Sequence, residues 1–458
     1  MKRSRKSVRT KGSSIPQLRF EDQRLTSFAG LVVIQKFFVL ILFKSRLQKC
    51  FGQLTRGKIY DRATIFMQLV IHLLLGYREL RDAVHYQDDP LVQRVLGLRS
   101  LPDVATISRM LKEADEQSVE KLRQLLGDMV LERLKSLALP RITLDFDGSV
   151  QSTKRRAEGA AVGFNKKKKG SRSYYPLFCT VAQTGQVLNF LHRAGNVHDS
   201  NGAKDFILNC VQQVRSVLPS VIIEVRMDSA FFSDEIVAAL NEDRVQFTIS
   251  VPFERFVELK KMIDGRKRWN TIDTELSYFE CQWKPKSWPQ RCRFVMVRTL
   301  AKQQQKGPVQ LDLFVPYQYG YEFKVIVTNK DLSAAALVKY HSGRGSQENV
   351  FGELKTHCHM DYIPVRKRCG NETYLLAGLF ALNLIRDLQM QIEPPTRTTT
   401  RQRPTLWVFE QVDTIRKTVL QRAGRLSHPS GKLTLTFRAG KKLKKRVLQI
   451  NEVLNTAA

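Results

Sequence analysis

The sequence lacks the features of a secreted or membrane-spanning protein. Its seven cysteines are odd in number and scattered along 458 residues, which is typical of reduced thiols and not of a disulfide framework. The most apolar stretch, residues 28–43, is interrupted by Gln35-Lys36 and is too short to cross a bilayer comfortably. No apolar core with a small-residue cleavage site follows the basic N-terminus. We therefore expect a cytoplasmic protein that makes no use of a membrane.

Acidic residues are few relative to basic ones. Lys and Arg number 75, whereas Asp and Glu number 43, which gives a formal net charge of +32. Folding alone does not require such an excess of one sign. It indicates a polyanionic partner, with nucleic acid as the first candidate and an anionic membrane surface as the second.

The chain has no detectable internal repeat, and its length predicts two to four domains. Its one cluster of histidine and cysteine, at residues 357–359 with Cys369, lacks zinc-finger spacing. Composition and periodicity divide the chain into five segments: 1–140 (a basic tail, then helices), 141–252 (strands and helices), 253–320 (β-rich), 321–390 (a strand, then helices) and 391–458 (basic again).

Within the first segment, residues 101–111 predict a turn that leads into a helix, with Asp103 as its N-cap. Thr106, Ser108 and Arg109 could then serve a helix–turn–helix motif that binds DNA. An ordinary surface helix of a bundle explains the same pattern equally well.

The second segment predicts a mixed α/β sheet with helices packed on it, because a meander of three strands precedes alternating helices and strands. A β-rich insertion follows, and a further strand at 322–327 returns to the sheet. The predicted strands are 141–147, 177–184, 187–193, 221–227 and 246–251, and the predicted helices are 199–217 and 232–242.

Two aspartates lie at the ends of predicted strands. Asp147 ends the alternating run 142–149 and shares a strand face with Asp145. Asp228 follows the β-branched run 221–227, at the kind of strand end where sites collect in α/β sheets. Both features also have structural explanations. Asp145 and Asp147 could form salt bridges with Lys or Arg, and Asp228 could cap a helix.

A third carboxylate lies on a predicted helix. Glu348 and Lys355 are seven residues apart and therefore share a helix face, which a solvated surface would also explain. Arg344 lies between Gly343 and Gly345, in a loop from which its planar fork could reach a phosphate. Together with the two strand-end aspartates, Glu348 could hold a pair of Mg²⁺ ions.

These stretches together resemble an insertion-sequence transposase of the DDE class, from the branch with a Tyr–Arg–Glu–Lys signature. The resemblance covers about residues 70–390, although Tyr340 lies one residue further from Arg344 than the signature expects. It is carried by Asp147-Gly148-Ser149, by Met227-Asp228-Ser229-Ala230-Phe231-Phe232, by the spacing of Arg344, Glu348 and Lys355, and by Arg193-Ala194-Gly195-Asn196-Val197-His198.

The resemblance implies a ribonuclease H-like mixed sheet with a β-rich insertion and an N-terminal helical domain for DNA binding or dimerisation. In that fold, 141–252 and 321–390 form two parts of one catalytic core. It implies two Mg²⁺ ions, which Mn²⁺ can replace, with Asp147 as the bridging ligand and Asp228 and Glu348 as flanking ligands. Asp147 is preferred over Asp145 because Gly and Ser follow it.

The implied partner is double-stranded DNA, at the inverted-repeat ends of an element and at its target, bound by a homodimer associated with the nucleoid. The implied reaction is cut-and-paste transposition by strand cleavage and strand transfer. A nucleic-acid-binding protein without catalysis and a ribonuclease H-like nuclease are the alternatives. The residues expected to bind DNA are Tyr340, Arg344, Lys355, Lys166, Lys167, Lys168, Lys169 and Arg172.

Overall fold

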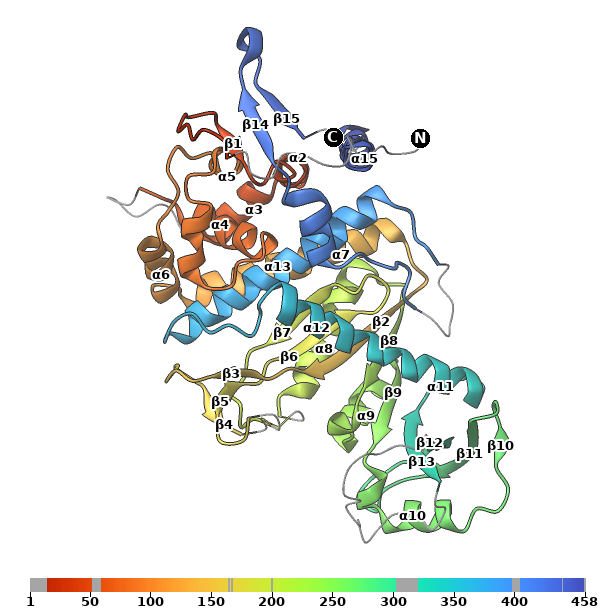
Figure 1. Cartoon of the computed structure of the whole chain (residues 1–458). Coiled ribbons are helices and arrows are strands. Elements are labelled where there is room, and N and C mark those ends of the chain that lie inside the picture. The colour runs from red at the N-terminus through yellow and green to blue at the C-terminus, as the bar shows by residue number, and fades with distance from the viewer. Residues whose placement is uncertain are drawn as a thin grey trace.

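The structure is a computed structural model of the chain (Figure 1). It describes residues 15–51, 59–163, 165, 168–198, 201–301, 320–397, 404–438 and 440–456.

A nine-stranded sheet forms the centre of the molecule, in the order β10-β11-β12-β13-β9-β8-β2-β6-β7. Five of these strands match the predicted ones: β2 (Arg141–Gly148), β6 (Leu177–Val181), β7 (Val187–Leu191), β8 (Ile222–Met227) and β9 (Gln246–Val251). β6 runs antiparallel to β2 and to β7, whereas β8 is parallel to both β2 and β9. Numbered along the chain, the spatial order is 3-2-1-4-5 with the second strand reversed, so the ribonuclease H-like mixed sheet is confirmed.

The two faces of this sheet are covered by different helices. Ile142, Leu144 and Phe146 of β2 pack in one apolar cluster with α8 (Ala203–Val217) and α9 (Asp234–Glu242). Burial of each such side chain contributes about 1.5–3 kcal/mol. The alternate positions, Thr143 and Asp145, face α11 (Ala334–Ser342) and α12 (Ser346–His357). These helices make polar contacts with the middle of the sheet and apolar contacts with the strands on either side.

The β-rich segment extends the same sheet and does not form a separate one. β13 (Tyr321–Thr328) pairs antiparallel with β9, and β12 (Cys292–Leu300), β11 (Leu276–Trp283) and β10 (Asn270–Thr271) follow in turn. Two of its tryptophans are buried in packing: the ring of Trp288 stacks on Phe232 with centroids 4.8 Å apart, and Trp283 donates its Nε1–H to Glu258 at 2.9 Å. Around this segment lie η3 (Phe253–Arg255) and α10 (Val257–Asp264).

The N-terminal segment is helical, as predicted. Side chains of Asp61, Asp89, Asp103 and Asp115 each accept a backbone N–H at the start of a helix, which satisfies donors that the helix itself leaves unpaired. Its helices are α2 (Leu31–Leu40), α3 (Phe43–Cys50), α4 (Arg62–Leu74), η1 (Leu80–His85), α5 (Pro90–Leu96), α6 (Val104–Lys112) and α7 (Glu116–Leu137).

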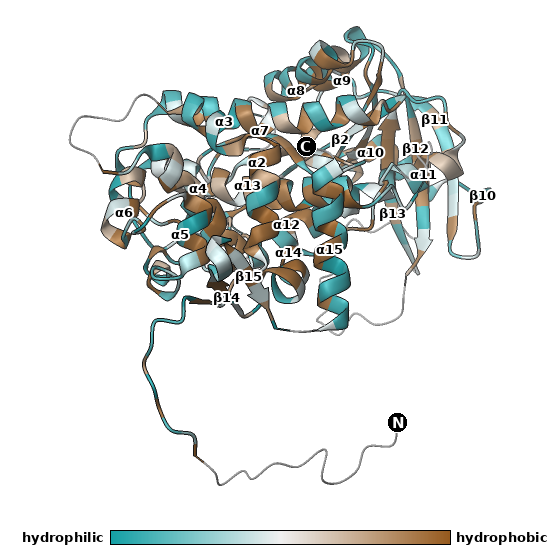
Figure 2. Cartoon of the chain, turned by 90° about the horizontal axis from the view of Figure 1, so that it is seen from above, coloured by the Kyte–Doolittle hydropathy of each residue, from teal (hydrophilic) through white to brown (hydrophobic). Residues whose placement is uncertain are grey.

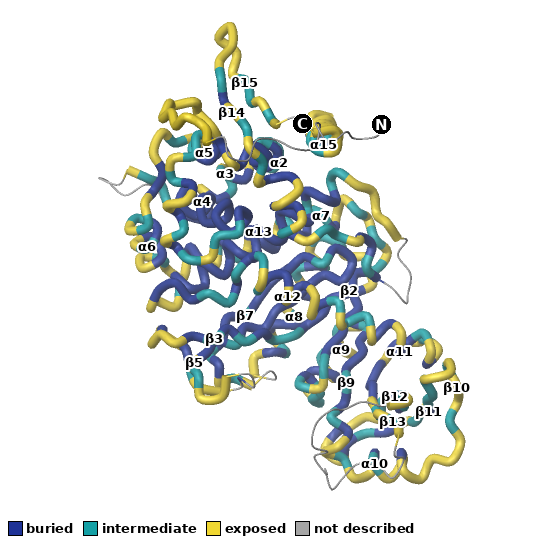
Figure 3. Tube along the Cα trace, viewed as in Figure 1, coloured by how far each residue is buried: buried dark blue, intermediate teal, exposed yellow. Residues whose placement is uncertain are grey.

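The helical unit also contains distant parts of the chain. The long helix α13 (Arg368–Ile392) packs against α4, α6 and α7 and lies in the buried interior of this unit (Figures 2 and 3). α15 (Lys441–Thr456) packs on α2 and α13, and the short strand β1 (Leu25–Thr26) pairs with β14 (Gly424–Ser427). The basic C-terminal segment is therefore part of one core with the N-terminal helices.

The remaining elements are short. β3 (Gln151–Thr153), β4 (Ala161–Val162) and β5 (Arg172–Tyr174) form a small sheet beside the central one. The others are η2 (Ser229–Phe231), η4 (Gly343–Gly345), α14 (Val412–Ile415), the π-helix η5 (Arg416–Leu420), η6 (Pro429–Gly431) and β15 (Thr434–Phe437). Among the described helices, none combines the length and the apolar character that crossing a membrane requires.

Candidate active site

Asp147 and Asp228 lie on neighbouring strands at the same edge of the sheet. β2 and β8 are parallel, and their register pairs Asp145 with Arg226 and Phe146 with Met227, so the next position on each carries one of the two aspartates. Asp147 Oδ1 accepts the backbone N–H of Gly148 at 2.7 Å, and Asp228 Oδ1 accepts that of Ala230 at 2.9 Å. Both side chains are partly exposed.

The start of α12 is held against this edge. Gln347 Nε2 donates to the backbone oxygen of Asp145 at 3.0 Å, and Arg344 Nη1 donates to Asp147 Oδ2 at 3.3 Å. Glu348 is exposed in the first turn of α12, next to Gln347, and half-buried Lys355 lies further along the same helix. The elements that carry the three predicted carboxylates therefore meet at one place.

A buried ion pair lies behind the aspartates. Arg226 donates to both carboxylate oxygens of Asp145, at 2.6 and 2.7 Å, and neither side chain is exposed by more than 1%. Burial alone would lower the pKa of Arg226, but the adjacent carboxylate of Asp145 outweighs it and raises that pKa. Both oxygens of Asp145 are thus engaged inside the protein, whereas Asp147, two residues further along the same strand, is partly exposed.

The position of Tyr340 corrects the prediction that it contacts DNA. The residue has no exposed surface, and its hydroxyl donates to Glu224 Oε2 at 3.3 Å. Its ring lies 5.2 Å from Arg226 Cζ and 4.5 Å from Lys330 Nζ, so cations cover the aromatic face. Burial raises the pKa of the Tyr340 hydroxyl. A side chain enclosed in this way supports the helix that leads to Arg344 and has no face to offer a nucleic acid.

The predicted basic loop lies partly outside the described residues. Lys166 and Lys167 fall there, whereas Lys168 and Lys169 are exposed shortly before β5 and Arg172 is exposed as its first residue. β3 begins three residues after β2 ends, so this small sheet leaves the central sheet at the edge that carries Asp147. The small sheet that carries these basic residues therefore begins next to Asp147 in the chain.

The three carboxylates are suited to a hard divalent cation by chemistry, since Mg²⁺ prefers oxygen ligands. Among the residues that the structure describes, however, no three His, Cys, Asp or Glu side chains come together closely enough to hold a metal ion. In this arrangement the guanidinium of Arg344 lies against Asp147, at 3.3 Å. For Asp147, Asp228 and Glu348 to bind one ion together, their carboxylate oxygens must therefore come closer to one another than they are in this structure.

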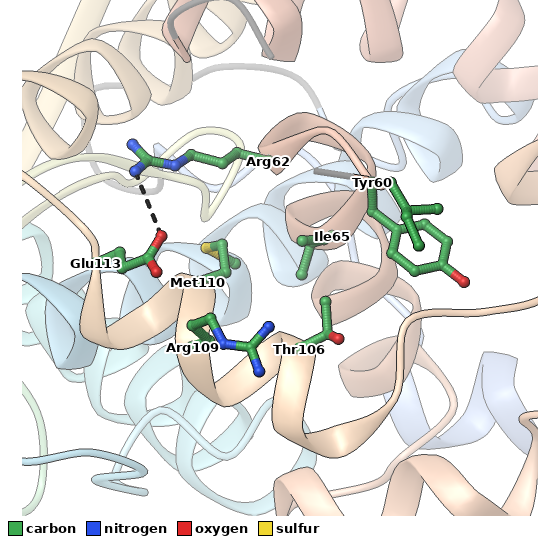
Figure 4. A pocket seen from close by; sticks show the side chains of 8 residues that line it. Tyr60, Arg62, Ile65, Thr106, Arg109, Met110 and Glu113 are labelled. Atoms are coloured by element: carbon green, nitrogen blue, oxygen red, sulfur yellow. Dashed lines mark ion pairs between the residues drawn. The ribbon is translucent and has the colours of Figure 1, made fainter. Parts of the chain in front are cut away.

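The helix predicted after residue 103 is present as α6, and Asp103 accepts the backbone N–H of Thr106 at 2.7 Å, as its predicted role as N-cap requires. Ile107, Met110 and Leu111 face the core. Between α4 and α6 lies a cavity of about 200 Å³ into which Arg109 and Thr106 project, and Arg62 on its wall pairs with Glu113 at 3.8 Å (Figure 4). Neither strand of the carboxylate edge contributes to it.

Comparisons with known proteins point to one enzyme class. The family model described as "Transposase DDE domain group 1" matches residues 9–457. No curated protein matches the chain significantly.

Among solved structures, a piggyBac transposase synaptic complex with hairpin DNA is 11% identical, with a TM-score of 0.40, over 93% of this chain and 85% of that chain. A Mos1 transposase paired-end complex with the left transposon end is also 11% identical, with a TM-score of 0.17, over 43% of this chain and 60% of the Mos1 chain.

Proposed function

Because the chain belongs to the family Transposase DDE domain group 1 and is therefore a DDE transposase, we propose that it binds the inverted-repeat ends of a mobile element and moves that element by cutting and rejoining DNA. We propose Asp147, Asp228 and Glu348 as its catalytic carboxylates. The observation that carries this proposal is the register of β2 and β8, which puts the two aspartates on adjacent strand ends, beside the first turn of α12.

The carboxylates would hold divalent cations, two Mg²⁺ ions or Mn²⁺ in their place, and these ions would activate the attacking oxygen and stabilise the leaving one. Asp147 is the central candidate because its carboxylate lies between the strand edge and the α12 side, where Arg344 already contacts it. The side chains of Asp228 and Glu348 would flank it from β8 and α12.

Arg344 would position the phosphate that is cut. Its guanidinium contacts Asp147 and is 18% exposed, so one side of the fork is available to a phosphate oxygen. Lys355, half-buried on the same helix, would add a second positive charge along the backbone of the DNA. Neutralising the phosphate in this way favours attack by an oxygen nucleophile.

The reaction needs no redox partner. In cleavage, water attacks phosphorus, the bond to the 3′-oxygen breaks, and that oxygen leaves as a 3′-hydroxyl after it takes up a proton. In strand transfer, the freed 3′-hydroxyl attacks a phosphorus of the target, so one phosphodiester forms as another breaks. Two copies of the chain would hold the two ends of the element together during these steps.

The direct experiment mixes the purified chain with a labelled duplex that carries the flanking repeat of its element. Cleaved and joined strands should form with Mg²⁺ and not with a chelator. Tight binding of the repeat without any cleavage in Mg²⁺ or Mn²⁺ would favour a non-catalytic binding protein. Equal cleavage of duplexes with and without the repeat would favour a general nuclease.

A further inference from the structure

Between residues 414 and 451, all charged side chains are basic. This stretch contains no Asp or Glu. Its basic residues are Arg416, Lys417, Arg422, Arg425, Lys432, Arg438, Lys441, Lys442, Lys444, Lys445 and Arg446. Four of them have partners. Arg416 is buried against backbone oxygens of α4, and Lys417 pairs with Asp413 at 2.7 Å. Arg422 donates to the backbone oxygen of Thr418, and Arg446 makes a double ion pair with Glu410. Most of the others are exposed, without an acidic residue nearby in sequence to neutralise them.

This charge is displayed on a hairpin that projects from the helical unit (Figure 1). β14 and β15 pair antiparallel, with Arg425 opposite Thr436 and Leu426 opposite Leu435. Opposite residues share a face and neighbours alternate, so the hairpin has two distinct faces. Leu426 is buried in the core of the helical unit and Leu435 packs against that core, whereas residues 428–433 at the tip are all exposed.

The outer face of the hairpin is polar. Arg425 and Thr436 are exposed on it, and the next pair outward is Ser427 with Thr434. These side chains supply hydrogen-bond donors of the kinds that contact base edges and phosphates. Pairing of Leu25 in β1 with Arg425 holds the base of the hairpin, so the face is fixed in orientation.

The helix that follows the hairpin presents lysines on a rigid support. Ile450 and Leu454 of α15 are buried against the helical unit, and Lys36 donates to the backbone oxygen of Asn451 at 2.7 Å. The first turns of the helix carry four exposed lysines, namely Lys441, Lys442, Lys444 and Lys445. A buried face on one side and lysines on the other distinguish α15 from a solvated tail.

We propose that the outer face of the β14–β15 hairpin and the lysines of α15 together bind duplex DNA. A two-stranded ribbon fits the major groove, about 12 Å wide, with Arg425, Ser427 and Thr436 toward the bases. The lysines of α15 lie along the phosphate backbone, where each contact releases counterions. The inference rests on the proposed function only for the partner's identity as DNA, because this surface shares no residue with the carboxylate edge.

The test measures duplex affinity of the full chain as a function of salt. The variant carries Arg425→Ala, Lys432→Ala and Arg438→Ala, and the charge-matched control carries Lys261→Ala, Lys267→Ala and Lys286→Ala, which are exposed in the β-rich segment. The probe is a labelled DNA duplex of mixed sequence, about two helical turns long. The hairpin variant should bind at least about tenfold more weakly at low salt, and its slope of log K against log salt should fall by about 2–3.

A control that loses as much affinity as the hairpin variant, or a hairpin variant that binds like the unchanged chain, overturns the inference. If the hairpin variant unfolds at lower denaturant than the unchanged chain, Lys444→Gln with Lys445→Gln on α15 takes its place, with the same direction of effect expected.

A second comparison uses an RNA duplex of the same sequence. The major groove of A-form RNA is too deep and narrow for side chains to read, so binding should be weaker than to DNA. Equal affinity for the RNA duplex, or for anionic vesicles, overturns the assignment to DNA. Asp147→Asn separates the two proposals. If Asp147→Asn abolishes cleavage while the hairpin variant binds the duplex like the unchanged chain, the proposed function is retained and this inference is overturned.

Discussion

Arg226 binds Asp145 with both arms of its guanidinium group, inside the sheet and out of contact with water. The third nitrogen, Nη1, donates to the backbone oxygen of Tyr340 at 2.9 Å. One side chain therefore joins β2, β8 and the end of the helix that leads to Arg344. Through this link the strand edge with Asp147 and the segment with Arg344 keep their relative position.

Removing one partner of this pair should destabilise the protein strongly. Arg226→Met leaves the carboxylate of Asp145 buried without its counter-charge, which costs about 3–5 kcal/mol of unfolding free energy. Denaturant unfolding measures the change. The double variant Asp145→Leu with Arg226→Met should recover most of the loss, because it leaves no charge unpaired. A single variant that loses less than about 1 kcal/mol would mean that the pair contributes little.

Gly343 should be required by its proximity to Arg226. A Cβ at this position would lie 2.5 Å from Arg226 Nη1, whereas a Cβ at Gly345 would meet nothing within 4 Å. Gly343→Ala must therefore displace the guanidinium or the segment that carries Arg344. Since misplacement by about 1 Å can cost on the order of 100-fold in rate, we expect cleavage to fall by about tenfold to 100-fold. Gly345→Ala is the control, and equal effects of both alanines would contradict the steric argument.

Arg344 should not be replaceable by lysine. Its planar fork can contact Asp147 and a phosphate at once, whereas an ammonium group acts as a single point charge. We expect both Arg344→Gln and Arg344→Lys to lower single-turnover cleavage by about 100-fold, on the scale of losing a charge-stabilising donor. Lys339→Gln, an exposed neighbour on α11, controls for the loss of one charge. Full activity of Arg344→Lys would contradict the assigned role.

Stability should fall as the pH drops below neutrality, in part through His192. Burial, and then the positive charges of Arg368 and Arg123, lower the pKa of His192 to about 3. The unfolded chain takes up this proton near pH 6.5. Between pH 6.5 and about 3 the unfolded state therefore binds more protons, so this contribution to stability is present above pH 6.5 and is lost as the pH falls.

His192→Phe keeps a ring beside Tyr174, whose centroid is 4.4 Å away, and removes the titration. Denaturant unfolding measures the unfolding free energy between pH 6 and 4. As the pH falls, this free energy should decline less steeply for the variant than for the unchanged chain, by up to about 1.4 kcal/mol per pH unit. Parallel curves for the two proteins would show that His192 does not titrate as its burial requires. His72 has its pKa lowered to about 3, mainly by burial, and should account for part of the remaining slope.

The strands of the core could be predicted from the sequence because each has a short alternating pattern. β8 and β9 begin and end within one residue of their predicted bounds. The same pattern does not show whether the polar face of a strand is buried. Glu224 and Arg226 alternate with apolar residues, which usually indicates a solvent-facing side, yet α11 from more than 100 residues downstream covers them. Only the tertiary contact with α11 distinguishes a buried polar face from a solvent-exposed one.

Contacts between segments far apart in the chain could not be predicted from the sequence. The sequence predicted a β-rich insertion and a strand at 322–327 that returns to the sheet, but no local signal marks β9 as the partner of β13 or shows that the insertion continues the same sheet. Likewise, nothing in residues 391–458 alone indicates that Leu454 shares a core with Ile34. For the site, motif spacing predicted Asp147, Asp228 and Glu348, and the structure adds the register that brings the aspartates together and the contact from Arg344.

The measurement that tests the central claim most directly is single-turnover cleavage of the repeat-bearing duplex by Asp147→Asn, Asp228→Asn and Glu348→Gln, alongside equilibrium binding of the same duplex. Amides keep the shape of the side chains and remove the charge that holds a divalent cation. Each variant should lose at least about 1,000-fold in cleavage and bind DNA within about threefold of the unchanged chain. Glu242→Gln, an exposed carboxylate away from the sheet edge, should cleave normally. Cleavage near the unchanged rate by any of the three site variants would contradict the assignment of that carboxylate to catalysis.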